Sequence, residues 1–257
     1  MQELKEMTRY QNRLIHERSK NKRLYVRVLD KVFPELVKIV KNVHNQFVYE
    51  LLSNYPTPQK IKRAHFSSLL KIKRLMADKA KQIQEAACLT TGNGALALQL
   101  ELLQLIEMIS IQTKQINQVQ EQINVLMVEI DSPITSITGI GVRLGAVIHA
   151  EIKNIHNFKT PGQLQAFAGL EPSIYQSGTM DITGHMVKRG SSYLHYSLIQ
   201  AAKLFANYPP HFKAYLRLKI SQGKHYNVAV SHVAKKLIRI IYYLLKTNQT
   251  FDERKLR

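Results

Sequence analysis

The chain lacks the cysteines that stabilise small secreted domains and hold most structural zinc ions. Its single cysteine, Cys88, has no partner for an internal disulfide or for a zinc finger of the usual spacing. The ten histidines are scattered, and no two of them stand at metal-ligand spacing on an expected helix. We therefore expect no metal-binding residues in this chain.

Uninterrupted hydrophobic runs are also missing. The most apolar stretch, residues 96–111, contains two glutamines and two glutamates, so it cannot cross a bilayer cheaply. The first ten residues, MQELKEMTRY, are charged and lack the hydrophobic centre of a secretion signal. We expect a cytoplasmic protein with no membrane partner.

Acidic residues are few relative to basic ones. Against 37 Lys and Arg the chain has only 18 Asp and Glu, which gives a net charge of +19. Such an excess favours a polyanionic partner, which could be nucleic acid, an acidic protein or an anionic membrane surface. A membrane surface would require a spanning or amphipathic segment, and none stands out. Because 45% of the residues are hydrophobic, the chain can also bury a core, in one large domain or two ordinary ones.

Residues 1–27 predict a basic helix. Apolar leucines and a methionine are interleaved with eight Lys and Arg, against three Glu. One interpretation is a solvated helical face, and the other is a helix that lies along a phosphate backbone. Both interpretations stay open at this point.

Prolines and glycines mark the next breaks, and a long heptad pattern follows them. Pro56 and Pro58 predict a turn that starts a new helix, and TTGNG at 90–94 predicts another break. From residue 95 to 130 two apolar rows repeat every seven residues, with Gln112 interrupting the second row and helping to fix the register. The first row is Leu102, Ile109, Ile116, Ile123 and Ile130, and the second is Leu98, Leu105, Gln112, Val119 and Leu126.

The heptad pattern indicates a coiled-coil seam and leaves its partner open. Isoleucine in one row with mostly leucine in the other favours a two-stranded pairing, which would make a homo-oligomer. A helix packed in a hairpin within its own chain would show the same stripe. Asp131, Ser132 and Pro133 end the segment and start the next helix.

The stretch after residue 131 predicts a helix-hairpin-helix. A short helix leads to Gly139-Ile140-Gly141, and a second helix follows with an apolar face. Glycines there let the backbone approach a phosphate, so that amides at the start of the second helix bind DNA without reading its sequence. A plain turn between two packed helices is the alternative, because a lone Gly-x-Gly is weak evidence.

The predicted fold is mostly α. We expect a basic helical and coiled-coil region at 1–130, and a compact helical domain with the helix-hairpin-helix at 131–257. Within the second region, Thr160 and Pro161 predict the cap and first turn of a helix that runs to about Ala168 and ends at Gly169.

The order of motifs in the second region resembles the C-terminal domain of the IS110 family of insertion-sequence transposases. The motifs are the Gly-Ile-Gly hairpin, FKTPGQLQAFAGLEPSIYQSG, HMVKRGSSYLHYSLIQAA and a basic helical tail. The likeness covers roughly residues 131–250 closely, and residues 1–130 look like the helical and coiled-coil middle of the same family.

The resemblance implies site residues. In that family a serine of this domain is the nucleophile that holds a broken DNA strand, and Ser177 stands at the matching position. Gly178 would let the loop admit a strand, and Lys188, Arg189 and Gly190 match the basic turn that holds phosphate. His195 stands where relatives often have arginine, so one phosphate contact would depend on pH here. Gly139 and Gly141 complete the expected DNA-binding set.

The same family carries a RuvC-like domain with four acidic residues in front of these motifs, and this chain shows no such cluster. From residue 131 onward it has only six Asp and Glu, and Mg²⁺ chemistry on DNA needs several carboxylates together. We therefore expect no cofactor in this chain, and Mg²⁺ only together with a carboxylate domain. Met1 falls where the family would already be past its last acidic motif, which suggests a truncated frame, an internal start or a split gene.

The function expected from the resemblance is DNA transposition by strand cleavage and rejoining through a serine. The expected partners are DNA, a guide RNA such as relatives use, and either a second copy or a full-length transposase. Two rival functions stay open: a truncated, non-catalytic DNA-binding regulator, and a repair accessory protein that uses only the helix-hairpin-helix.

Overall fold

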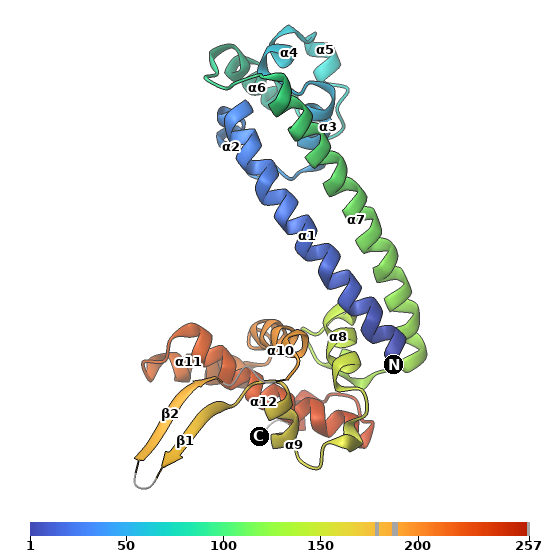
Figure 1. Ribbon diagram of the computed structural model, residues 1–257, viewed down its shortest axis with the longest axis vertical. Coiled ribbons are helices and arrows are strands. Elements are labelled where there is room, and N and C mark those ends of the chain that lie inside the picture. The colour runs from blue at the N-terminus through green and yellow to red at the C-terminus, as the bar shows by residue number, and fades with distance from the viewer. Residues whose placement is uncertain (178–179, 187–189, 256–257) are drawn as a thin grey trace. The chain divides into compact units, whose positions relative to one another are not determined.

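The computed structural model describes residues 1–177, 180–186 and 190–255, with residues 172–177 and 180–186 described by their backbone only. The described chain is mostly α-helical, which confirms the predicted fold class (Figure 1). It divides into two compact units, one made of Met1–Gln11 and Val119–Arg257 and the other of Asn12–Gln118. None of the described helices combines the length and apolar character of a membrane span.

These units do not follow the boundary expected at residue 130. The first eleven residues and the end of the heptad helix pack with the C-terminal unit. The physical reason is the length of two helices, α1 (Gln2–Val32) and α7 (Leu96–Ile130), each of which contributes residues to both units.

The unit of residues 12–118 contains most of α1 and α7 and a set of short helices between them. Thr57 caps α4 by accepting a hydrogen bond from the backbone amide of Lys60, and Pro58 occupies the first turn, as predicted. The break predicted at 90–94 separates α6 from α7. The short helices are α2 (Pro34–Ile39), α3 (Gln46–Asn54), α4 (Pro58–Arg63), α5 (Phe66–Leu69) and α6 (Ala77–Leu89).

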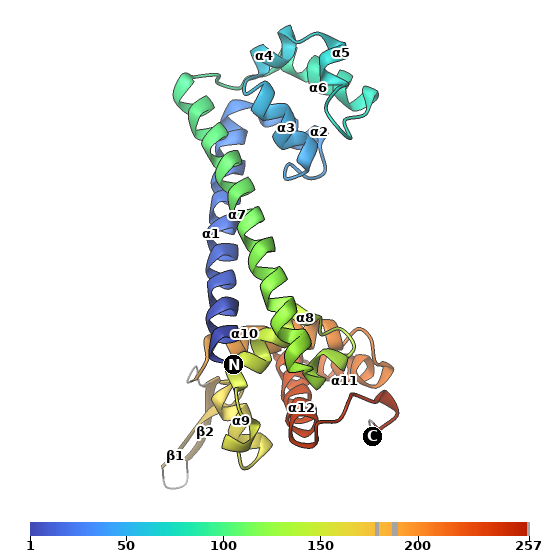
Figure 2. The ribbon, with the colours of Figure 1, turned by 90° about the vertical axis from the view of Figure 1, so that its right-hand side faces the viewer.

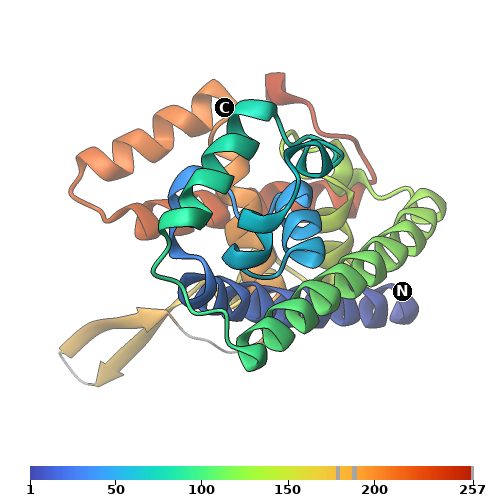
Figure 3. The ribbon, with the colours of Figure 1, turned by 90° about the horizontal axis from the view of Figure 1, so that it is seen from above.

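In this unit α1 and α7 pair in antiparallel directions. The ribbon views agree that they lie side by side (Figures 1, 2 and 3). Arg18 Nη1 donates to Thr113 Oγ1 at 3.1 Å. Asn21 Nδ2 donates to Gln112 Oε1 at 3.1 Å. The glutamine that interrupts the apolar row thus has a polar partner across the seam, which fixes one register.

The heptad rows pack mainly inside the chain. Ile109 is 1% exposed and Ile123 is not exposed at all, whereas Val125 and Val128 point outward and are 55% and 79% exposed. The structure therefore supports the hairpin alternative for the seam. Association of two copies through these rows stays a prediction.

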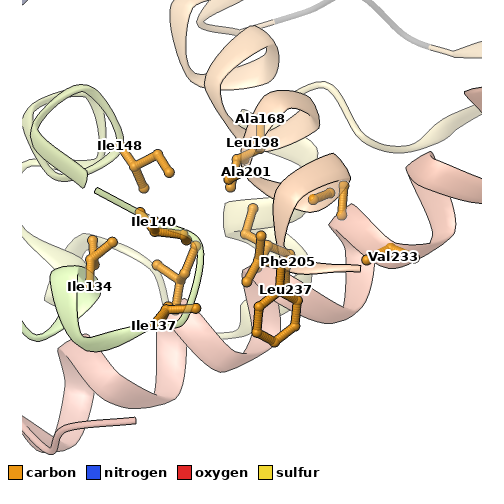
Figure 4. Close-up of a cluster of buried hydrophobic side chains, with 14 of the residues drawn as sticks. Ile134, Ile137, Ile140, Ile148, Ala168, Leu198, Ala201, Phe205, Val233 and Leu237 are labelled. Carbon is orange, nitrogen blue, oxygen red and sulfur yellow. The ribbon is translucent and has the colours of Figure 1, made fainter. Parts of the chain in front are cut away.

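The C-terminal unit is built around one large hydrophobic core. Side chains from most of its helices meet there, and Ile134, Ile140, Ile148, Phe205 and Leu237 are among those drawn in Figure 4. Its elements after α7 are the 3-10 turn η1 (Pro133–Ser136), α8 (Val142–Ile152), η2 (Ile155–Asn157), α9 (Pro161–Phe167), β1 (Pro172–Ser177), β2 (Met180–Met186), α10 (Ser192–Phe205), α11 (Pro210–Ser221), α12 (Tyr226–Thr247) and η3 (Glu253–Lys255).

A smaller apolar cluster joins the ends of α1 and α7 to α8 within this unit. It contains Leu4, Ile123, Met127, Ala146 and Ala150, all buried. Gln11 Nε2 also donates to Gln120 Oε1 at 2.9 Å. These contacts explain why the first turns of α1 belong to the C-terminal unit.

Among the described residues of the C-terminal unit, a β-hairpin interrupts the helices. Strands β1 and β2 pair in antiparallel directions, with a register irregularity between Pro172 and Ile174. The sequence predicts a compact helical domain here, so these strands are a difference from that prediction. Figure 1 shows the hairpin extending from the helices around it.

Candidate nucleic-acid interface

Ser177, the candidate nucleophile, is the last residue of strand β1. Its backbone pairs with Met180 at the start of β2, and Gln176 pairs with Asp181. The residue therefore stands at the end of the hairpin where the chain reverses. Gly178, which was expected to open this loop, lies outside the described residues, so its predicted role stays a prediction.

Gly190 lies between the hairpin and helix α10 and has a backbone conformation that requires glycine. Lys188 and Arg189 of the expected basic turn lie outside the described residues, but Gly190 is described and has a φ of +97°. A Cβ at this position would collide with the backbone carbonyl of Phe167. Ser191, the next residue, donates its backbone amide to the same carbonyl at 3.3 Å. The conformation and the close approach both require glycine here.

His195 links two helices instead of lying free on the surface. Its Nδ1 donates to the backbone carbonyl of Ala168 at 3.0 Å, which joins α10 to the end of α9. The ring is partly buried, and only Nε2 is left to meet a phosphate. The expected DNA contact at His195 stays a prediction.

The segment predicted as a helix-hairpin-helix has a single 3-10 turn, η1, in place of the first helix. Gly139 has a φ of +88°, and a Cβ there would press on the ring of Tyr208 at 3.2 Å. Gly141 is different, because it is the exposed N-cap of α8 and a Cβ there would meet nothing. Gly139 is thus required by the backbone, whereas Gly141 leaves the first amides of α8 open to solvent.

A buried carboxylate, Glu151, lies beside the turn at Gly190 and was not among the candidate residues predicted from the sequence. Glu151 on α8 has no exposed side-chain surface and accepts hydrogen bonds from Arg9 Nε at 2.7 Å and Arg9 Nη2 at 3.1 Å. Ser191 Oγ donates to it at 2.8 Å, and Lys5 Nζ lies 3.3 Å away. The guanidinium of Arg9 also lies 4.9 Å from the ring centre of Tyr193.

This cluster changes the ionisation of its carboxylate. Burial alone would raise the pKa of Glu151, but the hydrogen bonds from Arg9, Ser191 and Lys5 together hold that pKa below its ordinary value of 4.5. Glu151 is therefore ionised at neutral pH. Because Ser191 caps α10 directly after Gly190, the carboxylate fixes the point where the chain leaves the basic turn.

Helices α10, α11 and α12 lie in a segment that has no acidic residue at all. No Asp or Glu occurs between Asp181 and Asp252, and we call residues 182–251 the acid-free segment. Its cations on these helices and their connection are Lys203, Lys213, Arg217, Lys219, Lys224, Lys235, Lys236, Arg239 and Lys246. A surface of this kind attracts phosphate along its whole length.

Three of these cations gather around one histidine. Burial lowers the pKa of His232, and the nearby charges of Lys235, Lys219 and Lys224 lower it further. We call these three residues the lysine cluster. They come from α11, the α11–α12 connection and α12, so the packing of α11 against α12 brings them together. Among the described residues, the charges that shift the pKa of His232 are therefore all positive.

An aromatic ring holds one more lysine near this cluster. Lys236 Nζ lies 3.8 Å from the ring centre of Tyr215, and Lys219 Nζ lies 5.5 Å from the same ring. Cation–π contacts of this kind orient the ammonium groups without neutralising their charge. The lysines stay available to an anionic partner.

The candidate residues do not fit a metal site. In the part of the chain that the structure describes, no three His, Cys, Asp or Glu side chains gather so as to hold a metal ion. The one carboxylate at the base of the site, Glu151, is already bound by Arg9 and Ser191. No step through a metal is assigned to the residues of this chain.

Comparison with known proteins connects this geometry to a family. Residues 131–217 match the family model described as Transposase IS116/IS110/IS902 family. The similarity to this transposase family thus covers residues 131–217. The matched range begins just before η1 and runs into α11, so it contains the hairpin with Ser177, the glycine turn at Gly190 and the start of the acid-free segment.

Two relatives extend the similarity beyond that range. The chain is 23% identical over 239 residues to the 43.6 kDa protein of insertion element IS110 from Streptomyces coelicolor, an alignment that covers 88% of this chain and 58% of the relative. It is 31% identical over 121 residues to the transposase for insertion sequence element IS1111A from Coxiella burnetii, covering 46% of this chain and 33% of that protein. The chain thus spans less than two thirds of either relative.

Proposed function

We propose that this chain acts in the transposition of an insertion sequence and that its C-terminal unit binds DNA through phosphate contacts. The observation that carries the proposal is the acid-free segment, whose Lys219, Lys224 and Lys235 lie close enough to His232 to lower its pKa. The transposase family of residues 131–217 supports DNA as the polyanion. An RNA partner remains an expectation from the family resemblance.

The contacts are expected to be mainly independent of base sequence. Lysine ammonium groups bind phosphate as point charges, and such contacts position a protein on DNA without specifying a sequence. The open amides at the start of α8, next to Gly141, would add a backbone contact of the same kind.

His232 offers a direct readout of this binding. A phosphate placed among Lys219, Lys224 and Lys235 would offset their repulsion, so DNA should raise the pKa of His232. The pKa can be followed by NMR of the imidazole in the free and DNA-bound protein. A His232 pKa that stays the same while DNA is bound elsewhere would contradict a phosphate site at the lysine cluster.

We further propose that Ser177 is the nucleophile for strand cleavage. Its hydroxyl oxygen would attack a backbone phosphorus, the leaving oxygen would depart as an alcohol, and the strand would stay attached to the serine. A serine needs activation for this step, and the described residues supply no metal site for it. We propose that carboxylates of another chain, or of a segment outside residues 1–257, hold the metal that activates the serine.

The test supplies the RuvC-like carboxylate domain of a relative in trans, with Mg²⁺ and DNA of the element's ends. A covalent protein–DNA adduct should appear on a denaturing gel with both proteins present, and not with this chain alone. Ser177→Ala should abolish the adduct while leaving DNA affinity nearly unchanged, because electrostatic contacts dominate that affinity. An adduct that survives Ser177→Ala would remove Ser177 from the chemistry and favour the non-catalytic regulator.

A further inference from the structure

A polar groove in the unit of residues 12–118 shares no residue with the candidate nucleic-acid interface. Its volume is about 820 Å³, which is within the range typical of small-molecule sites. Side chains of α1, α3 and α7 and of the segment before α3 line it. All the lining residues belong to the same compact unit.

The α1 wall presents two cations, Arg18 and Lys22. Arg18 and Lys22 stand one turn apart and are both partly buried. In the part of the chain that the structure describes, neither has a carboxylate within ion-pair distance. Burial lowers the pKa of Lys22, and the charge of Arg18 lowers it further. Two like charges held together in this way favour an anion between them.

Arg18 is held in place for such a contact. Its Nη1 donates to Thr113 Oγ1, which in turn donates to the backbone carbonyl of Ile109 at 2.7 Å. A guanidinium has five N–H groups, so most of them remain for a ligand. Lys114, one residue beyond Thr113, lines the same groove and adds a third cation.

The wall at the start of α3 is aromatic and rigid. His44 Nδ1 and Tyr49 Oη are 2.8 Å apart. Behind them Tyr25 packs edge-on against Tyr49, with ring centres 5.2 Å apart, and donates its hydroxyl to the Val43 carbonyl at 3.1 Å. Burial lowers the pKa of His44, and Lys22 lowers it further, so its ring is neutral at pH 7. A neutral ring wall of this kind suits the flat face of a nucleobase.

Two carboxylates narrow the range of ligands. Glu50 and Glu107 also line the groove and would repel a bare phosphate. They would instead accept hydrogen bonds from sugar hydroxyls or from the amino group of a base. The groove thus combines cations for an anionic group, acceptors for hydroxyls and a ring wall for a base.

We propose that this groove binds a nucleotide, with its phosphate at Arg18 and Lys22 and its base beside Tyr49. The ligand is either a free nucleoside monophosphate or one nucleotide of a single strand, since both present the same groups. The proposal does not depend on DNA binding by the C-terminal unit, because none of its residues lies in that unit.

The test follows the imidazole of His44 and the ring of Tyr49 by NMR in the full chain. AMP, inorganic phosphate and adenosine are titrated separately. AMP should shift both signals and bind at least about tenfold more tightly than either fragment, since it gains the charged contacts and the ring contact together. Equal affinity for AMP and phosphate would overturn the role of the ring wall and with it the proposal.

Matched variants separate the groove from general charge attraction. Lys22→Gln should weaken AMP binding about tenfold, the effect of losing one charged hydrogen bond. Lys20→Gln removes the same charge from an exposed position of α1 outside the groove and should leave it unchanged. Lys22→Arg should retain binding, which guards against a folding defect. Equal losses in Lys22→Gln and Lys20→Gln, or AMP shifts confined to residues outside the groove, would overturn the proposal.

A single-stranded eight-nucleotide oligonucleotide distinguishes the two sources of the ligand. If the strand produces the same His44 and Tyr49 shifts at lower concentration than AMP, the groove holds one nucleotide of a strand. If AMP alone produces them, it holds a free nucleotide. Variants of the lysine cluster leave this site intact, so failure here and failure of the proposed DNA contact are separate results.

Discussion

The two compact units both carry excess positive charge, but they arrange it differently. In the C-terminal unit every Asp, Glu, Lys or Arg position of the acid-free segment, residues 182–251, is a cation, and its lysine cluster comes from α11, α12 and their connection. In the unit of residues 12–118 the cations of the groove face carboxylates and aromatic rings across a limited volume. Charge of one sign over a long surface suits a polymer of phosphates, whereas mixed groups in a groove suit one small ligand.

The two units also differ in the surroundings of their carboxylates. Glu151 in the C-terminal unit is buried and fully used by Arg9, Lys5 and Ser191, so it contributes structure and removes no charge from the helical surface around the lysine cluster. Glu50 and Glu107 in the other unit line a groove and keep their acceptor atoms for a ligand. Net charge alone would not distinguish these arrangements.

The largest expected effect concerns the part of α7 that packs in the C-terminal unit. Ile123→Ala should lower the free energy of unfolding by about 3 kcal/mol, because a fully buried isoleucine leaves a cavity beside Leu4 and Met127. Val125→Ala, two residues away and 55% exposed, should change it by less than about 0.5 kcal/mol. Urea unfolding measures both. Melting that depends on protein concentration in the wild type and not in Ile123→Ala would instead place this row in a dimer.

A somewhat smaller effect is expected at the turn after the hairpin. Gly190→Ala should destabilise the chain by about 2–3 kcal/mol, because its φ of +97° and the nearby Phe167 carbonyl both exclude a side chain. Gly162→Ala is the control, since a Cβ there makes only an ordinary contact at 3.6 Å with Thr160 Oγ1, and it should be neutral or slightly stabilising. Thermal unfolding of both variants compares them. Equal melting temperatures would show that the turn is not fixed in this conformation.

The smallest stability effect concerns the buried carboxylate, and it depends on pH. Glu151→Gln should cost about 1–2 kcal/mol at pH 7, a modest value because the Arg9 side chain is 38% exposed and partly screened. Since the folded pKa of Glu151 lies below 4.5, its stabilisation is complete above that pH and is lost as the pH falls through the folded pKa.

The free energy of unfolding, measured between pH 3 and 7, tests whether the stabilisation by Glu151 is lost toward acid pH. The difference between wild type and Glu151→Gln should shrink toward acid pH, whereas Glu121→Gln, at an exposed position of α7, should match the wild type throughout. A difference that grows toward acid pH would show that the hydrogen bonds do not favour the ionised form.

The helices and their ends could largely be predicted from the sequence. Thr160 and Pro161 form the expected cap and first turn, and Pro58 starts a helix as expected, because a side-chain oxygen and a fixed φ act locally. The cap at Thr57 was not among the predictions. The apolar rows of α7 also indicated a buried face, because helical periodicity needs no knowledge of the partner. Which surface covers that face depends on residues about a hundred positions away, and the heptad alone could not reveal it.

The site was predicted less completely, for reasons that depend on distance in sequence. Gly190 was predicted as a site residue from the family resemblance alone. The physical reason for a glycine there is that the Phe167 carbonyl leaves no room for a Cβ, and only the folded chain brings that carbonyl close. Glu151 was missed because its partners Arg9 and Ser191 are 142 and 40 residues away. The β-hairpin at Ser177 was not predicted. The glycines and basic residues around it were interpreted as a loop and a turn between helices.

The most direct test of the central claim is the salt dependence of DNA binding by the C-terminal surface. Lys219→Gln/Lys224→Gln/Lys235→Gln should reduce the slope of log binding constant against log salt by about 2–3, roughly 0.9 for each lost phosphate contact. Lys60→Gln/Lys62→Gln/Lys71→Gln removes the same charge from exposed positions in the other unit and should change the slope by less than about 1. Equal slopes for the two triple variants would contradict a phosphate-binding surface at the lysine cluster.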